Sequence, residues 1–205
     1  MRGPSLRLAR WHNHANAVGA PPALRHWLTD TGSLTVKLSA HSAAFRLQRL
    51  HQYPATCLAD EAAALGLARP GRVQEREVLL RCDNTPVVFG HSVVPVSATA
   101  ADWPLFGALG ERPLGTTVLF SDPLVARSDL QFARLQPSHP LAQRARRAWA
   151  GAGAGATQDD LSEQAVLFAR RRLYRRRHGL LLVTEVFFPS VLALAQAGHL
   201  IKNDE

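Results

Sequence analysis

Cysteine is scarce in this chain of 205 residues, which contains only Cys57 and Cys82. Two cysteines cannot form the set of disulfides that stabilises small secreted proteins. No Cys/His spacing typical of a zinc site occurs either. We therefore expect no metal, and a reduced intracellular compartment, the cytoplasm, is the simplest expectation.

Long apolar runs are also missing. No stretch reaches the roughly 18 consecutive apolar residues that a membrane-spanning helix requires, so we expect no membrane insertion. Residues 1–20 are basic but lack the apolar core of a signal peptide, and we expect them to form a flexible arm. The rest predicts one domain over residues 21–192, with a Gly/Ala-rich insertion at 151–163 and a C-terminal tail at 193–205.

Lysine is almost absent, since Lys37 and Lys202 are the only two, and arginine carries nearly all of the net charge of +8. The largest arginine cluster covers residues 170–172 and 175–177. It lies on an expected strand and has no interleaved aromatic platform, so it gives little support to a nucleic-acid partner. We expect it to form the outer face of a hairpin that lends positive potential to a nearby pocket.

Strands joined by tight turns dominate the pattern. Apolar segments at 73–82 and 87–96 flank a stretch with turn-forming residues, and 165–177 and 180–189 form a second hairpin. We expect further strands at 45–52 and 125–135, and helices at 21–28, 34–40, 101–109 and 141–150. Because crossover helices between strands are few, the sequence predicts an α+β domain: a single antiparallel sheet with helices packed on one side.

A single carboxylate, Glu185, lies within the apolar run 180–189. An ionised glutamate is costly to bury without a cation or hydrogen-bond donor beside it, and Arg76 is the candidate partner. With a period of two, Glu185 shares a face with Val183, and Arg76 shares a face with Val78. Opposite charges in one apolar layer indicate a pocket for a small polar molecule, a structural ion pair, or two edge positions facing water.

Weaker signals come from two other places. His91 lies in an apolar strand and is either an anion contact or an ordinary packed histidine. Pro113-Leu114-Gly115 is either a plain turn or the start of a short helix whose N–H groups meet a carboxylate. No catalytic triad context and no phosphate-binding glycine loop occurs.

Three motifs occur together and in order: Arg76-Glu77-Val78-Leu79-Leu80 with Val93-Val94-Pro95, then Pro113-Leu114-Gly115 with Leu119-Phe120, then Leu181 to Pro189. Over residues 22–190 this arrangement resembles the chorismate pyruvate-lyase family, which makes 4-hydroxybenzoate for ubiquinone. Gly32-Ser33-Leu34-Thr35 is similar to a family segment that helps to close the pocket.

The resemblance implies a sheet with helical flaps over an internal ligand pocket. It implies that Arg76 pairs with the ring carboxylate of chorismate, that the backbone at Leu114 contacts the ligand, and that Glu185 meets the ring 4-hydroxyl. Leu34 would form a pocket wall on a flap. His91 stands where family members often have arginine, so the cation for the second carboxylate stays open, with His91 as a candidate.

The implied function is a cofactor-independent lyase that converts chorismate to 4-hydroxybenzoate and pyruvate, acting as a monomer. Glu185 would accept a proton or only orient the substrate. The alternative from another class is a non-catalytic sensing domain of the same fold, which binds an aromatic acid; such sensors normally follow a DNA-binding domain, and only about 20 residues precede the first expected helix here. A third possibility is a chorismate-acting enzyme with a different aromatic product.

Overall fold

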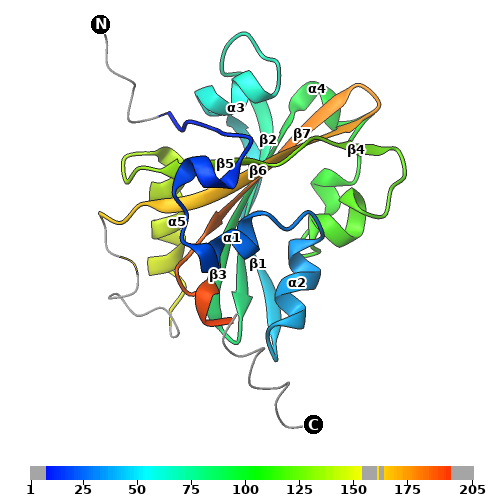
Figure 1. Cartoon of the computed structure of the whole chain (residues 1–205). Coiled ribbons are helices and arrows are strands. Elements are labelled where there is room, and N and C mark those ends of the chain that lie inside the picture. The colour runs from blue at the N-terminus through cyan, green and yellow to red at the C-terminus, as the bar shows by residue number, and fades with distance from the viewer. Residues whose placement is uncertain (1–7, 154–160, 162–163, 195–205) are drawn as a thin grey trace, which may run out of the picture.

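The computed structural model describes residues 8–153, 161 and 164–194. Within them, seven strands form one antiparallel sheet in the order β1-β2-β3-β7-β6-β4, with β5 also paired to β6 (Figure 1). The strands are β1 (Phe45–Thr56), β2 (Arg72–Cys82), β3 (Thr85–Pro95), β4 (Val125–Arg127), β5 (Gln131–Leu135), β6 (Leu167–Arg176) and β7 (Gly179–Phe187).

The helices are short, and most of them lie in the connections between strands. The α-helices are α1 (Pro22–Leu28), α2 (Leu34–Ala40), α3 (Ala59–Ala64), α4 (Val96–Thr99) and α5 (Pro140–Ala150). Two 3₁₀ turns and one π-helical turn complete the set: η1 (Ala15–Val18), η2 (Phe106–Ala108) and η3 (Gly115–Leu119). Among the described residues, none of these helices has the length and apolar character needed to cross a bilayer.

Two tight hairpins organise the centre of the sheet. β2 and β3 join at Asp83 and Asn84, whose φ angles of 48° and 67° fit the two-residue turns that suit twisted antiparallel strands. β6 and β7 join at Arg177 and His178. Both predicted hairpins are therefore confirmed, and β3 and β7 lie side by side in the sheet.

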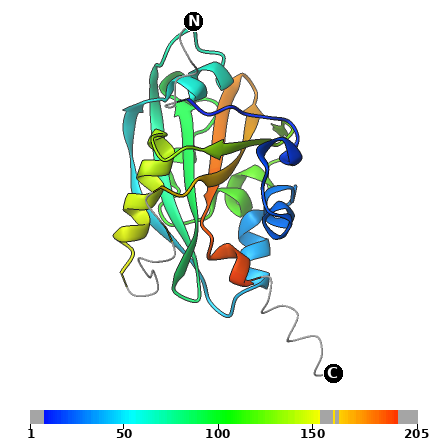
Figure 2. The ribbon, with the colours of Figure 1, turned by 60° about the vertical axis from the view of Figure 1, so that its left-hand side comes forward.

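Helices cover both faces of this sheet. α1, α2 and η3 pack on the face that presents residues such as Leu80 and Leu181, whereas α3 and α5 pack on the face that presents Phe89 and Val93. Figure 2 shows α5 in yellow-green on one side of the sheet and the blue α1 and α2 on the other. The predicted α+β fold with a single antiparallel sheet is confirmed, but the expectation that the helices pack on one side is corrected, because α3 and α5 cover the other face.

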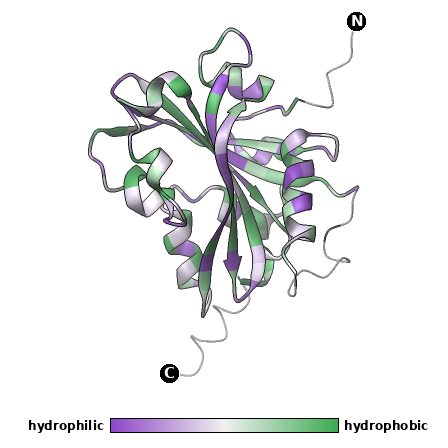
Figure 3. Ribbon diagram, turned by 180° about the vertical axis from the view of Figure 1, so that it is seen from behind, coloured by the Kyte–Doolittle hydropathy of each residue, from purple (hydrophilic) through white to green (hydrophobic). Residues whose placement is uncertain are grey.

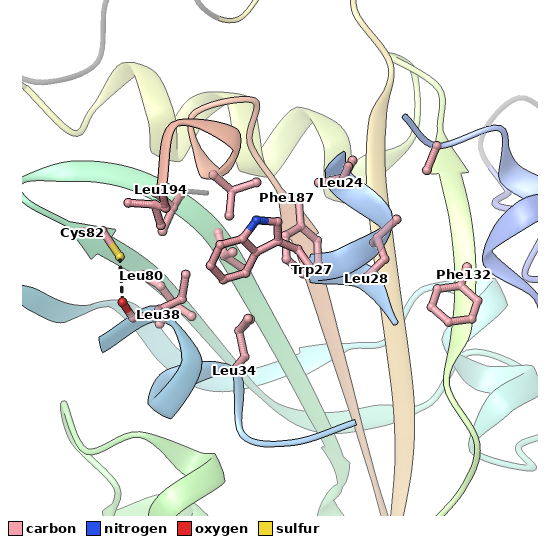
Figure 4. Close-up of a cluster of buried hydrophobic side chains, with 14 of the residues drawn as sticks. Leu24, Trp27, Leu28, Leu34, Leu38, Leu80, Cys82, Phe132, Phe187 and Leu194 are labelled. Carbon is pink, nitrogen blue, oxygen red and sulfur yellow. Dashed lines mark hydrogen bonds between the residues drawn. The ribbon is translucent and has the colours of Figure 1, made fainter. Parts of the chain in front are cut away.

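Trp27 anchors α1 to the sheet. Its side chain is fully buried and lies among Leu34 and Leu38 of α2, Leu80 of β2 and Phe187 of β7 (Figure 4). A buried aromatic side chain of this size supplies a large share of the apolar contact area in a core. The contact therefore fixes α1 and α2 on the sheet and positions the loop between them.

The expected flexible arm at residues 1–20 differs from what the structure shows for residues 8–20. Ala15 and Val18 of η1 are buried, and His12 pairs with Phe132 of β5. A four-residue 3₁₀ turn is too short to produce a readable apolar period, so this packing could not be predicted from the sequence. The insertion at 151–163 and the tail at 193–205 lie largely outside the described residues.

Two other elements differ in detail. The strand expected at 125–135 is divided into β4 and β5, because the polar pair Ser128 and Asp129 interrupts its apolar pattern. The helix expected at 101–109 contains only η2, since Pro104 removes a backbone donor and cannot continue a helix.

Charged side chains are buried within the sheet as well as displayed on its surface. In Figure 3, purple segments interrupt the green strands. The buried charged or titratable residues are Glu61, Glu75, Arg76, Glu77, His91, His139, Arg170 and Arg171. Because burying a charge without a partner is costly, their positions direct attention to the two faces of the central strands.

Candidate active site

A cavity lies between the sheet and two flaps on the face that carries α1 and α2. The first flap is residues 30–35, which lead into α2, and the second flap is residues 113–120, which contain η3. The cavity encloses about 720 Å³, including the space at its mouth.

The floor of the cavity is made from two rows of residues that run across neighbouring strands in register. The first row is Arg76, Ser92, Val183 and Arg172. The second row is Val78, Gly90, Glu185 and Arg170. Small or apolar side chains thus occupy the middle of the first row, between its two arginines, whereas the second row has Val78 and Gly90 at one end and the charged Glu185 and Arg170 at the other.

Gly90 is a position of the second row where a side chain would not fit. A Cβ atom at this position would lie 2.8 Å from Cγ2 of Val78, which is closer than packed carbon atoms approach. The missing side chain therefore makes room for the Val78 side chain. Gly90 itself lines the cavity and lies directly beside Glu185 in the sheet.

Arg76 is buried at one end of the first row, with 2% of its surface exposed. One Nη2 atom donates to the carbonyl oxygens of Gly110 (3.1 Å) and Arg112 (3.0 Å), which orients the guanidinium. Among the described residues no carboxylate lies within ion-pair distance of it, and its buried Nε has no hydrogen-bond partner. Burial, with a smaller contribution from the charge of Arg49, lowers the pKa of Arg76 to about 10.

Glu185 is paired with Arg170 and not with Arg76. The Nε of Arg170 donates to Oε2 of Glu185, and the carboxylate remains about one-fifth exposed. The predicted direct partnership of Arg76 and Glu185 is wrong, because β3 and β7 place them in different rows while Arg170 lies directly beside Glu185. Both residues nevertheless line the same cavity, as a ligand pocket requires.

Arg170 also holds the first flap in place. Its Nη1 donates to the carbonyl oxygens of Trp27 (3.0 Å), Leu28 (3.3 Å) and Asp30 (2.6 Å). A cation is favourable here because the free carbonyls at the C-terminus of α1 carry partial negative charge. The same guanidinium therefore links the flap to Glu185.

The two flaps meet over the cavity. The Ser33 hydroxyl lies 3.4 Å from the point where a Cβ of Gly115 would stand. Asp30 is held by Lys37 at 3.0 Å. Burial alone would raise the pKa of Asp30, but the hydrogen bonds from Lys37 and from the Gly32 N–H outweigh it and lower that pKa.

Four of the five residues predicted for the site lie together. Arg76, Glu185, Leu114 and Leu34 all line the cavity, with Leu34 on the first flap and Leu114 on the second. Their roles toward a ligand stay predictions at this point. The sequence did not identify Arg170 and Arg172, which also line the cavity.

These two arginines were expected on the outer face of a hairpin, and that expectation is wrong for both. Arg170 is buried and Arg172 is half-buried. Their alternation with Arg171 along β6 was readable, because residues two apart in a strand share a face. They were not identified because they belong to a run of consecutive arginines, a pattern that is typical of an exposed, charged strand.

His91 is the exception among the predicted site residues, because it lies on the opposite face of the sheet. Its neighbours Gly90 and Ser92 line the cavity, so the alternation of the strand turns His91 away from it. There its Nε2 lies 2.8 Å from Oε1 of Glu61, and its Nδ1 lies 3.1 Å from Oε1 of Glu77. The prediction that His91 contacts the substrate is corrected accordingly.

Carboxylates around His91 make it a cation. Burial alone would lower the pKa of His91, but Glu61 and Glu77 outweigh it and raise that pKa to about 10. Arg144 of α5 donates to both Glu75 (2.8 Å) and Glu77 (2.9 Å). His51, Glu75 and Glu77 have the donor types of a metal site, but the Arg144 guanidinium already donates to both carboxylates.

Two solved structures share the fold. The C-terminal domain of PhnF aligns with a TM-score of 0.51 over 70% of this chain and 82% of that chain, at 13% identity. A GntR-family transcriptional regulator from Bacillus cereus aligns with a TM-score of 0.50 over 71% of this chain and 92% of that chain, at 11% identity. Identities this low establish a likeness of fold alone.

Curated relatives match at much higher identity, and each of the following is named probable chorismate pyruvate-lyase. The protein of Cupriavidus metallidurans is 47% identical over 91% of this chain and 83% of its own length. The protein of Ralstonia nicotianae is 46% identical over 80% of this chain and 80% of its own length. The protein of Nitrosomonas europaea is 39% identical over 88% of this chain and 95% of its own length. The model of the chorismate lyase family matches residues 5–196. The chain therefore belongs to the chorismate lyase family.

Proposed function

We propose that this protein removes pyruvate from chorismate to give 4-hydroxybenzoate, the first committed step of ubiquinone biosynthesis. The observation that carries the proposal is that one cavity is lined both by the buried Arg76, which has no carboxylate within ion-pair distance among the described residues, and by the carboxylate of Glu185. Arg76 would bind the ring carboxylate, because a guanidinium matches a carboxylate with two parallel hydrogen bonds. The backbone at Leu114 and the side chain of Leu34 would close over the ring.

The chemistry is an elimination. The ether bond between ring carbon C3 and the enolpyruvyl oxygen breaks, the proton on C4 is lost, and the released enol becomes pyruvate. The ring becomes aromatic, which supplies much of the driving force, so we expect no cofactor and no metal. The cavity must bind the dianion, exclude water and lower the barrier to proton loss.

Glu185 is the group that we propose assists the loss of the proton from C4. Its carboxylate would meet the 4-hydroxyl, on the carbon that loses the proton. A carboxylate held by Arg170 and partly shielded from water can accept a proton or a hydrogen bond from that hydroxyl. We propose Glu185 and Arg76 as the catalytic pair, in a monomeric cytoplasmic enzyme.

The test is to mix purified protein with chorismate in the presence of a metal chelator and to follow the products by chromatography. We expect equal amounts of 4-hydroxybenzoate and pyruvate. A different aromatic product would replace the proposed reaction with another one on chorismate. Unchanged chorismate with folded protein, together with binding of 4-hydroxybenzoate, would contradict the lyase and favour a sensing domain.

A further inference from the structure

The cavity contains more positive than negative charge once its internal ion pairs are counted. Glu185 is paired with Arg170, and Asp30 is paired with Lys37. Arg76 and Arg172 remain, and among the described residues neither has a carboxylate within ion-pair distance. Both also have a buried Nε without a hydrogen-bond partner. Two such cations in one cavity favour a ligand with two anionic groups.

The two arginines face each other along the first row of the floor. Arg76 is on β2 and Arg172 is on β6, with Ser92 and Val183 between them in register. Three strand spacings separate their backbones by about 14 Å. Because both arginines line the same cavity from opposite ends of this row, their guanidiniums can contact opposite ends of one ring-sized ligand.

We propose that Arg172 binds the second carboxylate of the substrate, the one on the enolpyruvyl group, while Arg76 binds the carboxylate on the ring. This inference rests on the proposed function. The enolpyruvyl ether is on the carbon next to the one that carries the 4-hydroxyl, so it must lie close to Glu185. Arg172 is on the strand beside Glu185, one position along from Arg170 on the same face, and His91, on the other face, cannot take this role.

Contacts around Arg172 orient it for this purpose. Its Nη1 donates to the carbonyl oxygen of Thr31 at 3.1 Å, which ties it to the first flap. Tyr174, the next residue on that face of β6, lines the cavity as well. Burial and the nearby charge of Glu185 raise the pKa of Tyr174 to about 12, so its hydroxyl stays neutral and can donate a hydrogen bond to the same carboxylate.

The test compares a dianionic substrate with a monoanionic product. We expect Arg172→Gln to raise KM for chorismate by roughly tenfold or more, as loss of a charge-assisted pair does, and to leave the inhibition constant of 4-hydroxybenzoate nearly unchanged. Arg175→Gln is the matched control, because it removes the same charge from an exposed position on the same strand. Arg172→Lys, which keeps the charge, should fall between wild type and Arg172→Gln.

Two results would overturn the proposal. One is an unchanged KM for chorismate in Arg172→Gln; the other is an equal loss of affinity for chorismate and 4-hydroxybenzoate, which would make Arg172 a flap anchor only. If wild-type protein does not turn chorismate over, calorimetry with the dianion 3-(carboxymethoxy)benzoate and the monoanion benzoate tests the second anion site separately from the proposed reaction. Loss of the dianion alone in Arg172→Gln would still support the second anion site, whereas the proposed reaction would have failed.

Discussion

Arg76 is a cation that the fold buries against two backbone carbonyls instead of a carboxylate. Its charge is therefore oriented but not neutralised within the described part of the chain. An anionic ligand would restore the electrostatic stabilisation that burial removes. Glu185, in contrast, already has a partner in Arg170, which holds its carboxylate in a fixed direction.

Replacing Arg76 by alanine should weaken substrate binding strongly. We expect KM for chorismate to rise by an amount equivalent to about 2–4 kcal/mol, since a buried charged partner of the ring carboxylate is lost. The inhibition constant of 4-hydroxybenzoate should rise by a similar factor, because it has the same carboxylate. Arg72→Ala, exposed on the same strand, is the control, and steady-state kinetics like wild type in Arg76→Ala would rule out this assignment.

Replacing Glu185 by glutamine should affect turnover more than folding. We expect kcat to fall by roughly 10²–10⁴-fold if the carboxylate accepts the proton, with a small change in the free energy of unfolding because the side chain is partly exposed. The measurements are kcat and urea unfolding of the same preparation. If Glu185→Gln instead lowers the free energy of unfolding strongly while kcat per folded molecule equals that of wild type, Glu185 has a structural role only.

The sequence predicted individual residues of the site from periodicity, with one clear failure. Arg76 and Glu185 were correctly placed on a buried face because residues two apart share a side of a strand. His91 was misplaced because β3 is buried on both faces, so the apolar pattern does not show which face His91 presents. The ion pair of Glu185 with Arg170 depends on which strands are neighbours, and a single sequence does not state that.

At the scale of elements, the first flap depends on one arginine. Arg170 donates to three carbonyls at the end of α1 and also to Glu185. Trp27 fixes α1 from the core side. Because the flap covers the cavity, replacing Arg170 should alter both the stability of the flap and the position of Glu185 in the site.

Arg170→Met keeps the length of the side chain but removes its donors. We expect a loss of about 1–3 kcal/mol in the free energy of unfolding, less than for a fully buried pair because Glu185 is partly exposed. Amide hydrogen exchange in residues 28–35 should speed up, and kcat should fall. Arg175→Met serves as the control on the same strand; unchanged exchange in the flap of Arg170→Met would show that other contacts hold it.

Elements were predicted best where a pattern of several residues repeats. The hairpins β2–β3 and β6–β7 follow from alternating apolar residues around turn-forming residues. η1 and the division between β4 and β5 were missed, since segments of three to five residues give too little pattern. The helix expected at 101–109 is reduced to η2 because Pro104 cannot continue a helix.

At the scale of the whole molecule, the two faces of the sheet have different electrostatics. One face has unpaired cations around the cavity, and the other has His91 enclosed by Glu61 and Glu77 beneath α3 and α5. His91 also shapes the pKa values of its partners: burial alone would raise the pKa of Glu77, but His91 and Arg144 outweigh it and lower that pKa. The titratable groups of this second face therefore form a buried charge network beneath α3 and α5.

Stability should depend on the charge of His91. Its pKa is raised in the folded protein from 6.5 to about 10, so its contribution is complete below pH 6.5 and is lost as the pH rises toward about 10. The difference in unfolding free energy between wild type and His91→Gln should therefore shrink across that range in urea titrations. His178→Gln, at an exposed turn, should show no such trend, and a pH-independent difference for His91→Gln would contradict the ionised His91.

The central claim is that the cavity holds the aromatic acid with its carboxylate on Arg76 and its hydroxyl toward Glu185. A crystal structure with 4-hydroxybenzoate bound tests it most directly. We expect the ligand carboxylate at about 2.7–3.0 Å from the Arg76 guanidinium, the ring over Gly90, and the hydroxyl facing Glu185. A ligand outside the cavity, or one reversed so that its carboxylate meets the arginines of β6, would contradict the account.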